Sequence, residues 1–309
     1  MTEAIAFLVV TAGVFGLVIG SFLNVVAHRV PRGISLMRES RCPQCDALVR
    51  MRWNVPVVSW LILKGRCARC GAPISPRYPV VELLTGIVFA LVALGVSIGR
   101  SPDLRPVDGP LWFGTAEFWG TLITLETFAA LSIALTLIDL DSRRLPNRIV
   151  IPGWVTMGGM LFVTALLTGI EPTNSQALAI GASEPATTSA FPGLASVDWT
   201  PLLRAVIGGF ALFVFYYVVR WISPRGMGGG DVKLAGLLGT VMGWFGWGSL
   251  VFGAFAAFLL GGLFGAVLLV LGRARRGTAI PFGPWMMAGA WVGIAVGEPL
   301  GRWYVGLLG

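Results

Sequence analysis

The sequence predicts an all-α polytopic membrane protein with about eight transmembrane helices and a small cysteine-rich domain between the first two. Two observations predict this fold class. Hydrophobic residues make up 55% of the 309-residue chain and charged residues only 12%, whereas a soluble domain carries about 25% charged residues. Apolar runs of about 20 residues, the length that crosses a bilayer core, also recur along the whole chain.

The first apolar run is expected to be a retained membrane helix. No Lys or Arg precedes it and no small-residue cleavage site follows it, although a signal peptide usually has both. Seven further runs follow. The sixth is short, and the eighth contains Glu298 and Arg302, charges that are costly inside a membrane. The expected spans are residues 4–26, 80–99, 118–138, 149–170, 201–222, 232–247, 249–271 and 284–306.

Basic residues collect in every second loop between these spans. Residues 27–78 hold ten of the 23. The loops after spans three and seven hold three each, and so does the junction of spans five and six, with Arg220, Arg225 and Lys233. Residues 171–200 hold none, and we expect residues 174–200, which are rich in Ser, Ala, Thr, Gly and Pro, to form a flexible external loop. Because basic loops stay in the cytoplasm, both termini are expected outside. The basic residues that produce the net charge of +8 therefore have a role in setting the membrane orientation. Membrane lipids and no nucleic acid are the expected partners.

All four cysteines lie in the first cytoplasmic loop, as two CxxC pairs separated by 21 residues. This spacing is typical of a tetrahedral four-thiolate zinc site, which leaves no open position for chemistry. A loop of about 50 residues has a marginal core, so we expect a structural zinc. Two disulfides are the alternative, which the reducing cytoplasm disfavours. The expected ligands are Cys42, Cys45, Cys67 and Cys70, with Gly71 relaxing the second turn.

These patterns divide the chain into three expected parts. Residues 1–26 form the first transmembrane helix, and residues 27–79 form the cytoplasmic four-cysteine zinc domain. Residues 80–309 form a membrane domain with the seven further spans.

Two aspartates at the edges of apolar runs are candidate functional residues. Asp139 follows span three and Asp231 precedes span six, and the expected topology places both at the cytoplasmic face. Each could also have a local role. Asp139 or the neighbouring Asp141 could pair with Arg143 or Arg144, and Asp231 could cap the following helix.

Two carboxyls at one depth are suited to peptide hydrolysis. One ionised carboxylate takes a proton from water while the other carboxyl donates to the carbonyl oxygen, and no metal is needed. The glycines before Asp231 allow close approach of a substrate strand. The only histidine, His28, has no poised serine near it in sequence, and the chain contains no Walker A, HExxH or soluble aspartic protease signature.

Six motifs then occur in a fixed order. They are GSFLNVV at 20–26, the cysteine pairs with PVVSW at 56–60 between them, ISPRYPVVEL at 74–83, Asp139 seven residues before Pro146, GGGD at 228–231 and IPFGP at 280–284. In these motifs the chain resembles the type IV prepilin peptidases, also called prepilin leader peptidase/N-methyltransferases. It departs from the family pattern at Ser142, where His is frequent, at Asn147, where Asp is frequent, and at Trp53, where an acidic residue is common.

The resemblance implies a membrane aspartic endopeptidase of the bacterial inner membrane. Such enzymes remove the basic leader from prepilins or pseudopilins at the cytoplasmic face, and many then methylate the new N-terminus with S-adenosylmethionine. A peptidase without methyltransferase activity, and a non-enzymatic zinc-stapled scaffold or transporter, are the alternatives. By position the catalytic pair is Asp139 and Asp231, the supporting residues are Asp141, Gly228, Gly230 and Lys233, and Arg77 and Glu82 are the candidates for the cofactor site.

Overall fold

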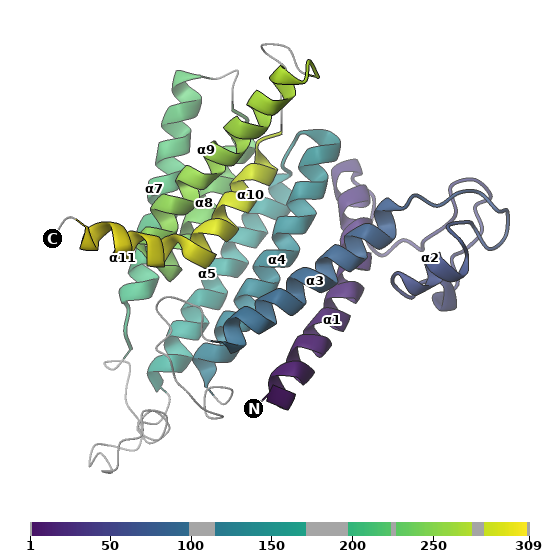
Figure 1. Cartoon of the computed structure of the whole chain (residues 1–309). Coiled ribbons are helices and arrows are strands. Elements are labelled where there is room, and N and C mark those ends of the chain that lie inside the picture. Colours follow the sequence, from purple (N-terminus) through teal and green to yellow (C-terminus); the bar gives the residue numbers. More distant parts are fainter. Residues whose placement is uncertain (1, 99–114, 171–196, 224–226, 274–280, 308–309) are drawn as a thin grey trace. The chain divides into compact units, whose positions relative to one another are not determined.

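A computed structural model of the chain describes residues 2–98, 115–170, 197–223, 227–273 and 281–307 (Figure 1). Within these ranges the regular elements are helices, and the paired extended backbone amounts to two isolated bridges in the cysteine-rich domain. The prediction of an all-α protein is therefore confirmed. Most of the expected external loop at 174–200 lies outside the described residues.

Six of the described helices are long and apolar enough to cross a membrane. They match the first, second, third, fourth, fifth and seventh expected spans, most of them extended by two or more residues at one end. These helices are α1 (Thr2–Arg29), α3 (Arg77–Ser97), α4 (Ala116–Ser142), α5 (Asn147–Ile170), α7 (Thr200–Ile222) and α9 (Trp247–Val270).

The sixth expected span corresponds to α8 (Gly229–Phe245), which has only 17 residues. Most of its side chains are buried, and it packs against α5, α7, α9 and α10 (Gly283–Val292). A helix that protein surrounds in this way does not need a long lipid-facing surface. A count of eight spans stays a prediction, because the length and composition of the described helices support six.

The eighth expected span is divided in the structure. It consists of α10, a π-helical turn (Gly293–Gly297) and α11 (Glu298–Gly306), and the ribbon bends along it (Figure 1). The Gly248 N–H donates to Oε2 of Glu298 over 3.0 Å. Glu298 therefore satisfies an N–H of the first turn of α9, where the helix dipole favours a negative charge.

The described residues fall into two compact units, residues 1–94 with 126–138 and residues 95–125 with 139–309. In the first unit, glycines bring α1 close to α3. A Cβ atom at Gly16 would lie 2.8 Å from Cβ of Phe89, and one at Gly20 would lie 2.8 Å from Cα of Glu82. Small residues at such crossings let helix backbones pack closely in a membrane. The unit also contains the short helices α2 (Val58–Ile62), Val30–Arg32 and Met51–Trp53, and residues 126–138 of α4.

In the second unit, α8 lies at the centre of a helix bundle. Gly208 and Gly239 meet where α7 crosses α8, so closely that neither position has space for a Cβ atom. Trp154 of α5 donates its indole N–H to Oγ1 of Thr240 over 2.8 Å. This close packing on several sides fixes α8 and, with it, the position of the helix start.

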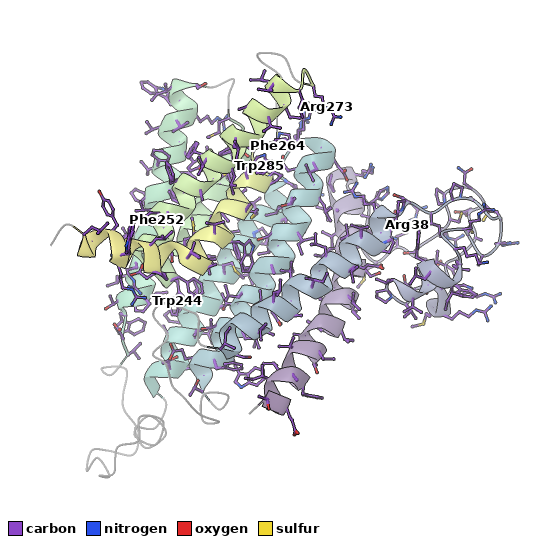
Figure 2. The ribbon with its side chains drawn as sticks, in the orientation of Figure 1. Arg38, Trp244, Phe252, Phe264, Arg273 and Trp285 are labelled. Atoms are coloured by element: carbon purple, nitrogen blue, oxygen red, sulfur yellow. The ribbon has the colours of Figure 1, made fainter. Side chains whose placement is uncertain are left out.

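The helices α9 and α10 pack against each other in the same unit. The rings of Phe264 and Trp285 lie side by side with their centroids 4.6 Å apart (Figure 2). In the same pair of helices, a Cβ atom at Gly289 would lie 2.5 Å from the backbone nitrogen of Ala257. The position of α10 is therefore set by backbone contact as well as by aromatic packing.

Candidate active site

Asp139 lies in the last turn of α4, and its residue surface is only 4% exposed. The N–H of Gly283, the first residue of α10, donates to its Oδ2 over 3.1 Å. The helix ends at Ser142, and the next residue, Arg143, adopts a left-handed conformation and donates its N–H to the Asp139 carbonyl. A helix 144 residues away in sequence thus orients the buried carboxyl group.

Asp231 lies in the first turn of α8. The Gly228 N–H donates to its Oδ2 over 2.9 Å. Burial raises the pKa of Asp231 above the ordinary value of an aspartate, while the hydrogen bond from Gly228 and the charge of Arg220 oppose this rise. Arg220 is in the last turn of α7.

Both aspartates belong to the second unit, and their carboxyl groups interact electrostatically. Asp231 does contact the start of its own helix, as the helix-cap alternative predicts. Asp139 does not fit the local alternative, because it pairs with neither Arg143 nor Arg144 and contacts α10 instead. A helix-end role therefore does not account for the burial of Asp139 beside a second carboxyl.

The other expected supporting residues lie around this pair. Lys233 donates from Nζ to Oδ1 of Asn147 over 2.9 Å, which links the first turns of α8 and α5. A Cβ atom at Gly230 would lie 2.8 Å from Cβ of Leu145, so a glycine permits the close approach of the loop after α4. Asp141 is exposed, unlike Asp139.

Three features of the site were not predicted from the sequence. The first is the N–H of Gly283, although the motif at 280–284 marked the segment. The second is Arg220, whose charge reaches Asp231. The third is Tyr216, which is buried, interacts with Asp231 and stacks on Phe258 with ring centroids 5.4 Å apart. An aromatic side chain at helical spacing is usually part of the hydrophobic core, so no pattern in the sequence marks Tyr216 as functional.

Replacement of Gly283 by Ala is expected to lower any reaction that uses Asp139. The new Cβ atom would lie 2.7 Å from Oδ2 of Asp139 and must displace the carboxyl group. A shift of about 1 Å at a catalytic group can cost on the order of 100-fold in rate. We expect kcat to fall by roughly 10- to 100-fold with little change in KM. Gly262→Ala is the matched control, because a Cβ atom there meets nothing within 4 Å; equal kinetics for the two variants would contradict the prediction.

The four cysteines form one cluster in the first unit, with their sulfur atoms all within 4.8 Å of one another. The two CxxC turns have the same backbone hydrogen bonds, 25 positions apart. The Cys42 N–H donates to the Ala47 carbonyl over 3.0 Å, and the Cys67 N–H donates to the Ala72 carbonyl over 2.8 Å. The residue after each pair has a positive φ, which is 51° at Asp46 and 73° at Gly71. The cluster is therefore built from two equivalent knuckles.

The geometry of the cluster suits a metal ion better than disulfides. The sulfur atoms of Cys42 and Cys70 are 3.9 Å apart, far beyond the bond length of about 2.05 Å in a disulfide. Tetrahedral zinc with Zn–S bonds of about 2.3 Å separates its sulfur ligands by about 3.8 Å. The four cysteines could thus hold one ion of this kind, and none of them forms a disulfide.

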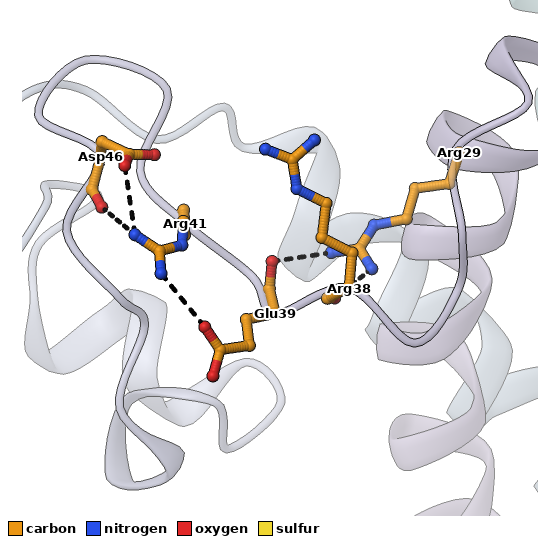
Figure 3. A network of polar contacts seen from close by, with 5 residues as sticks. All are labelled: Arg29, Arg38, Glu39, Arg41 and Asp46. Atoms are coloured by element: carbon orange, nitrogen blue, oxygen red, sulfur yellow. Dashed lines mark hydrogen bonds and ion pairs between the residues drawn. The ribbon is translucent and has the colours of Figure 1, made fainter.

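The segment before the first knuckle is tied to the end of α1 (Figure 3). Arg29 donates to the carbonyl oxygens of Arg38 and Glu39. Arg41 then forms salt bridges with Glu39 and Asp46 over 3.2 and 3.1 Å. Exposed salt bridges contribute little to stability, so the contacts of Arg29 with the backbone are the more important restraint on this segment.

Glu82, one of the two candidates for a cofactor site, is buried in the first unit. Its Oε2 accepts the Val57 N–H over 2.7 Å. Val57 has a φ of 60°, which is unfavourable for a β-branched residue. Glu82 therefore stabilises the strained entry to α2. Arg77, the other candidate, is exposed at the first residue of α3.

Comparison with known proteins agrees with this arrangement. Residues 14–96 match the Bacterial Peptidase A24 N-terminal domain, and residues 127–270 match the Type IV leader peptidase family. The second range contains both Asp139 and Asp231. A prepilin leader peptidase/N-methyltransferase of Aeromonas salmonicida (strain A449) is 33% identical over 94% of this chain and 91% of its own length.

The chain belongs to the type IV leader peptidase family. Proteins with the same name from Neisseria gonorrhoeae and Pseudomonas aeruginosa are 32% and 29% identical, over 93% and 100% of this chain and 90% and 97% of their own lengths. The resemblance predicted from the six motifs is thus confirmed. No solved structure shows a significant match to the chain.

Proposed function

We propose that this chain is an aspartic endopeptidase that removes the basic leader from type IV prepilins or pseudopilins. Membership of the leader peptidase family supports prepilin processing in general. The observation that supports the aspartic mechanism is the buried carboxyl of Asp139 beside that of Asp231, each oriented by one backbone N–H. The two aspartates are the proposed catalytic pair, and Asp141, Gly228, Gly230 and Lys233 support them.

Such a pair can complete the hydrolysis of a peptide bond without a metal ion, because each proton that is taken up or given away is returned within one reaction cycle. One carboxylate takes a proton from water as the water oxygen bonds to the carbonyl carbon, and the other carboxyl protonates the carbonyl oxygen. The C–N bond of the resulting diol then breaks. The leaving nitrogen receives the proton taken from water, and a diol hydroxyl returns the other. The products are a free carboxyl and a free amine, and the pair regains its starting state.

The proposed reaction takes place at the cytoplasmic face of the bacterial inner membrane. Three observations support this location at the membrane: the basic loops, the six apolar helices and the position of both aspartates at helix ends. A prepilin has a basic leader followed by an apolar segment. With that segment in the membrane, its cleavage site would lie at the depth of the two aspartates. The proposed topology has eight spans and places both termini outside.

The direct test uses the purified protein in lipid nanodiscs and a purified prepilin. We expect a product that lacks the leader, identified by its intact mass and its N-terminal sequence. A non-enzymatic membrane scaffold predicts that the prepilin stays intact. Unchanged prepilin after incubation with correctly folded protein would contradict the proposed peptidase.

Methylation of the new N-terminus is a second proposed activity. The names of the relatives, which include N-methyltransferase, support it. Labelled S-adenosylmethionine added to the cleavage assay should transfer its methyl group to the mature product. Cleavage without label would show a peptidase only.

If the wild type does transfer label, Glu82→Gln and Arg77→Gln test the two candidate cofactor residues. Methylation is then measured separately from cleavage.

We also propose that the four cysteines bind one structural zinc ion within a cytoplasmic domain of residues 27–79, between the first helix and the membrane peptidase domain of residues 80–309. The thiolate donor set, the sulfur spacing and the two equivalent knuckles support this proposal. Zinc would hold the knuckles together and take no part in hydrolysis, because four thiolates complete its coordination.

A further inference from the structure

Arg220 occupies the space beside the glycine run that precedes Asp231. A Cβ atom at Gly229 would overlap Nη1 of Arg220, so the guanidinium lies where a side chain would otherwise be. The charge of Arg220 stabilises the ionised form of Asp231. The absence of a side chain at Gly229 thus permits a cation close to one of the two aspartates.

The two aspartates have different charge environments. Each accepts one backbone N–H, from Gly228 to Asp231 and from Gly283 to Asp139. The charge of Arg220 also acts on Asp231, although no salt bridge joins the two in the described residues. Within that part of the chain, no cation acts in this way on Asp139, which is only 4% exposed. Two close carboxyls cannot both ionise easily. The single negative charge is therefore more stable on Asp231.

The other elements around α8 do not change this asymmetry. Neither α9 nor α10 contains a titratable residue. The only charged residue of α5 is Arg148, and Lys233 of α8 donates to Asn147. On α7, Tyr216 interacts with Asp231, but a phenol is neutral at physiological pH. On α4, Asp141 is a further carboxylate and cannot supply positive charge.

We propose that Arg220 is a positioning residue that keeps Asp231 ionised, which makes Asp231 the general base and Asp139 the general acid. Asp231 takes the proton from water as the water oxygen attacks, and Asp139 gives its proton to the carbonyl oxygen. When the C–N bond breaks, Asp231 passes its proton to the leaving nitrogen, and Asp139 regains one from the diol. This assignment rests on the proposed peptidase function.

The dependence of kcat/KM on pH tests the assignment. Activity falls at low pH as Asp231 becomes protonated and can no longer act as a base. Without the cation the carboxylate is less stable, so its pKa rises and the acidic limb moves to higher pH. For Arg220→Gln we expect an upward shift of about one pH unit. Arg220→Lys keeps the charge and should leave the limb near its wild-type position.

Salt concentration gives a second readout. Arg220 is exposed, and a Debye length of about 3 Å at 1 M salt screens such a charge. The acidic limbs of the wild type and of Arg220→Gln should therefore lie closer together on the pH axis in about 1 M salt. Arg273→Gln, which removes an arginine that does not contribute to the electrostatics of Asp231, is the matched control.

The outcomes separate this inference from the proposed function. If the wild type does not cleave prepilin, the peptidase proposal fails. If the wild type cleaves and Arg220→Gln lowers the rate at every pH without moving the limb, Arg220 is merely structural and the inference is overturned. If Arg220→Gln does not fold, Gly229→Ala replaces it, because the new methyl group displaces the guanidinium. An unmoved limb in that variant would also overturn the inference.

Discussion

Asn at either Asp139 or Asp231 is expected to abolish prepilin cleavage. Asn has nearly the same shape as Asp, so its amide oxygen can still accept the N–H of Gly283 or Gly228. It can neither take a proton from water nor donate a carboxyl proton. Because general acid–base catalysis contributes about 10²- to 10⁴-fold, we expect each variant to lose about 10²- to 10⁴-fold in kcat.

The two substitutions should not be additive. When two residues act as one catalytic unit, removal of either one already abolishes most of the catalysis that the pair provides. The double variant is therefore expected to be no slower than the slower single variant. Asp198→Asn is the control, because Asp198 is exposed and its Oδ1 accepts the Thr200 N–H at the start of α7. Near-normal cleavage by either single variant would disprove the pairing.

The same assay decides between Asp139 and Asp141. Asp141→Asn is expected to lose much less activity than Asp139→Asn, because Asp141 is exposed whereas the Gly283 N–H orients Asp139. Prepilin processing over a time course, with the membrane content of each variant matched by immunoblot, gives the comparison. A larger loss at Asp141 would exchange the roles of the two residues.

The two aspartates can be predicted from the sequence because each is marked by its immediate neighbours in the chain. A charge at the edge of an apolar run is visible from composition, and the basic loops indicate a common face. The contacts that orient the aspartates are not local. Gly283 is 144 residues from Asp139. The guanidinium of Arg220 lies beside Gly229, and its charge acts on Asp231. No pattern in a single sequence predicts which backbone N–H meets which carboxyl.

Glu298 shows why the last span is difficult to predict from hydropathy. A charge within an apolar run signals either the end of a span or a polar site, and hydropathy does not distinguish them. In the structure Glu298 accepts the Gly248 N–H at the start of α9, next to a π-helical turn in its own segment. The short helix α8 is a similar case, since burial by its neighbours compensates for its length.

Removal of the proposed zinc is expected to unfold the cysteine-rich domain. Zinc binding stabilises zinc-finger peptides by about 10–16 kcal/mol, more than the marginal core of a short loop can supply. Cys42→Ser or Cys67→Ser should therefore lose the metal and expose the segment around residues 40–75 to protease. Elemental analysis, with limited proteolysis in nanodiscs, measures both effects. Met37→Ser is the control, because Met37 lies in the same segment and is 94% exposed.

The equivalence of the two knuckles makes the zinc prediction specific. Cys42 and Cys67 occupy the same place in the same hydrogen-bonded turn, so either serine variant should lose zinc and gain protease sensitivity to a similar extent. A disulfide would respond to reductant instead, but the Cys42–Cys70 sulfur separation of 3.9 Å excludes a bond between them in this conformation. Protein purified under reducing conditions without chelators should hold about one zinc per chain. If it holds none, the loop must derive its stability from packing alone.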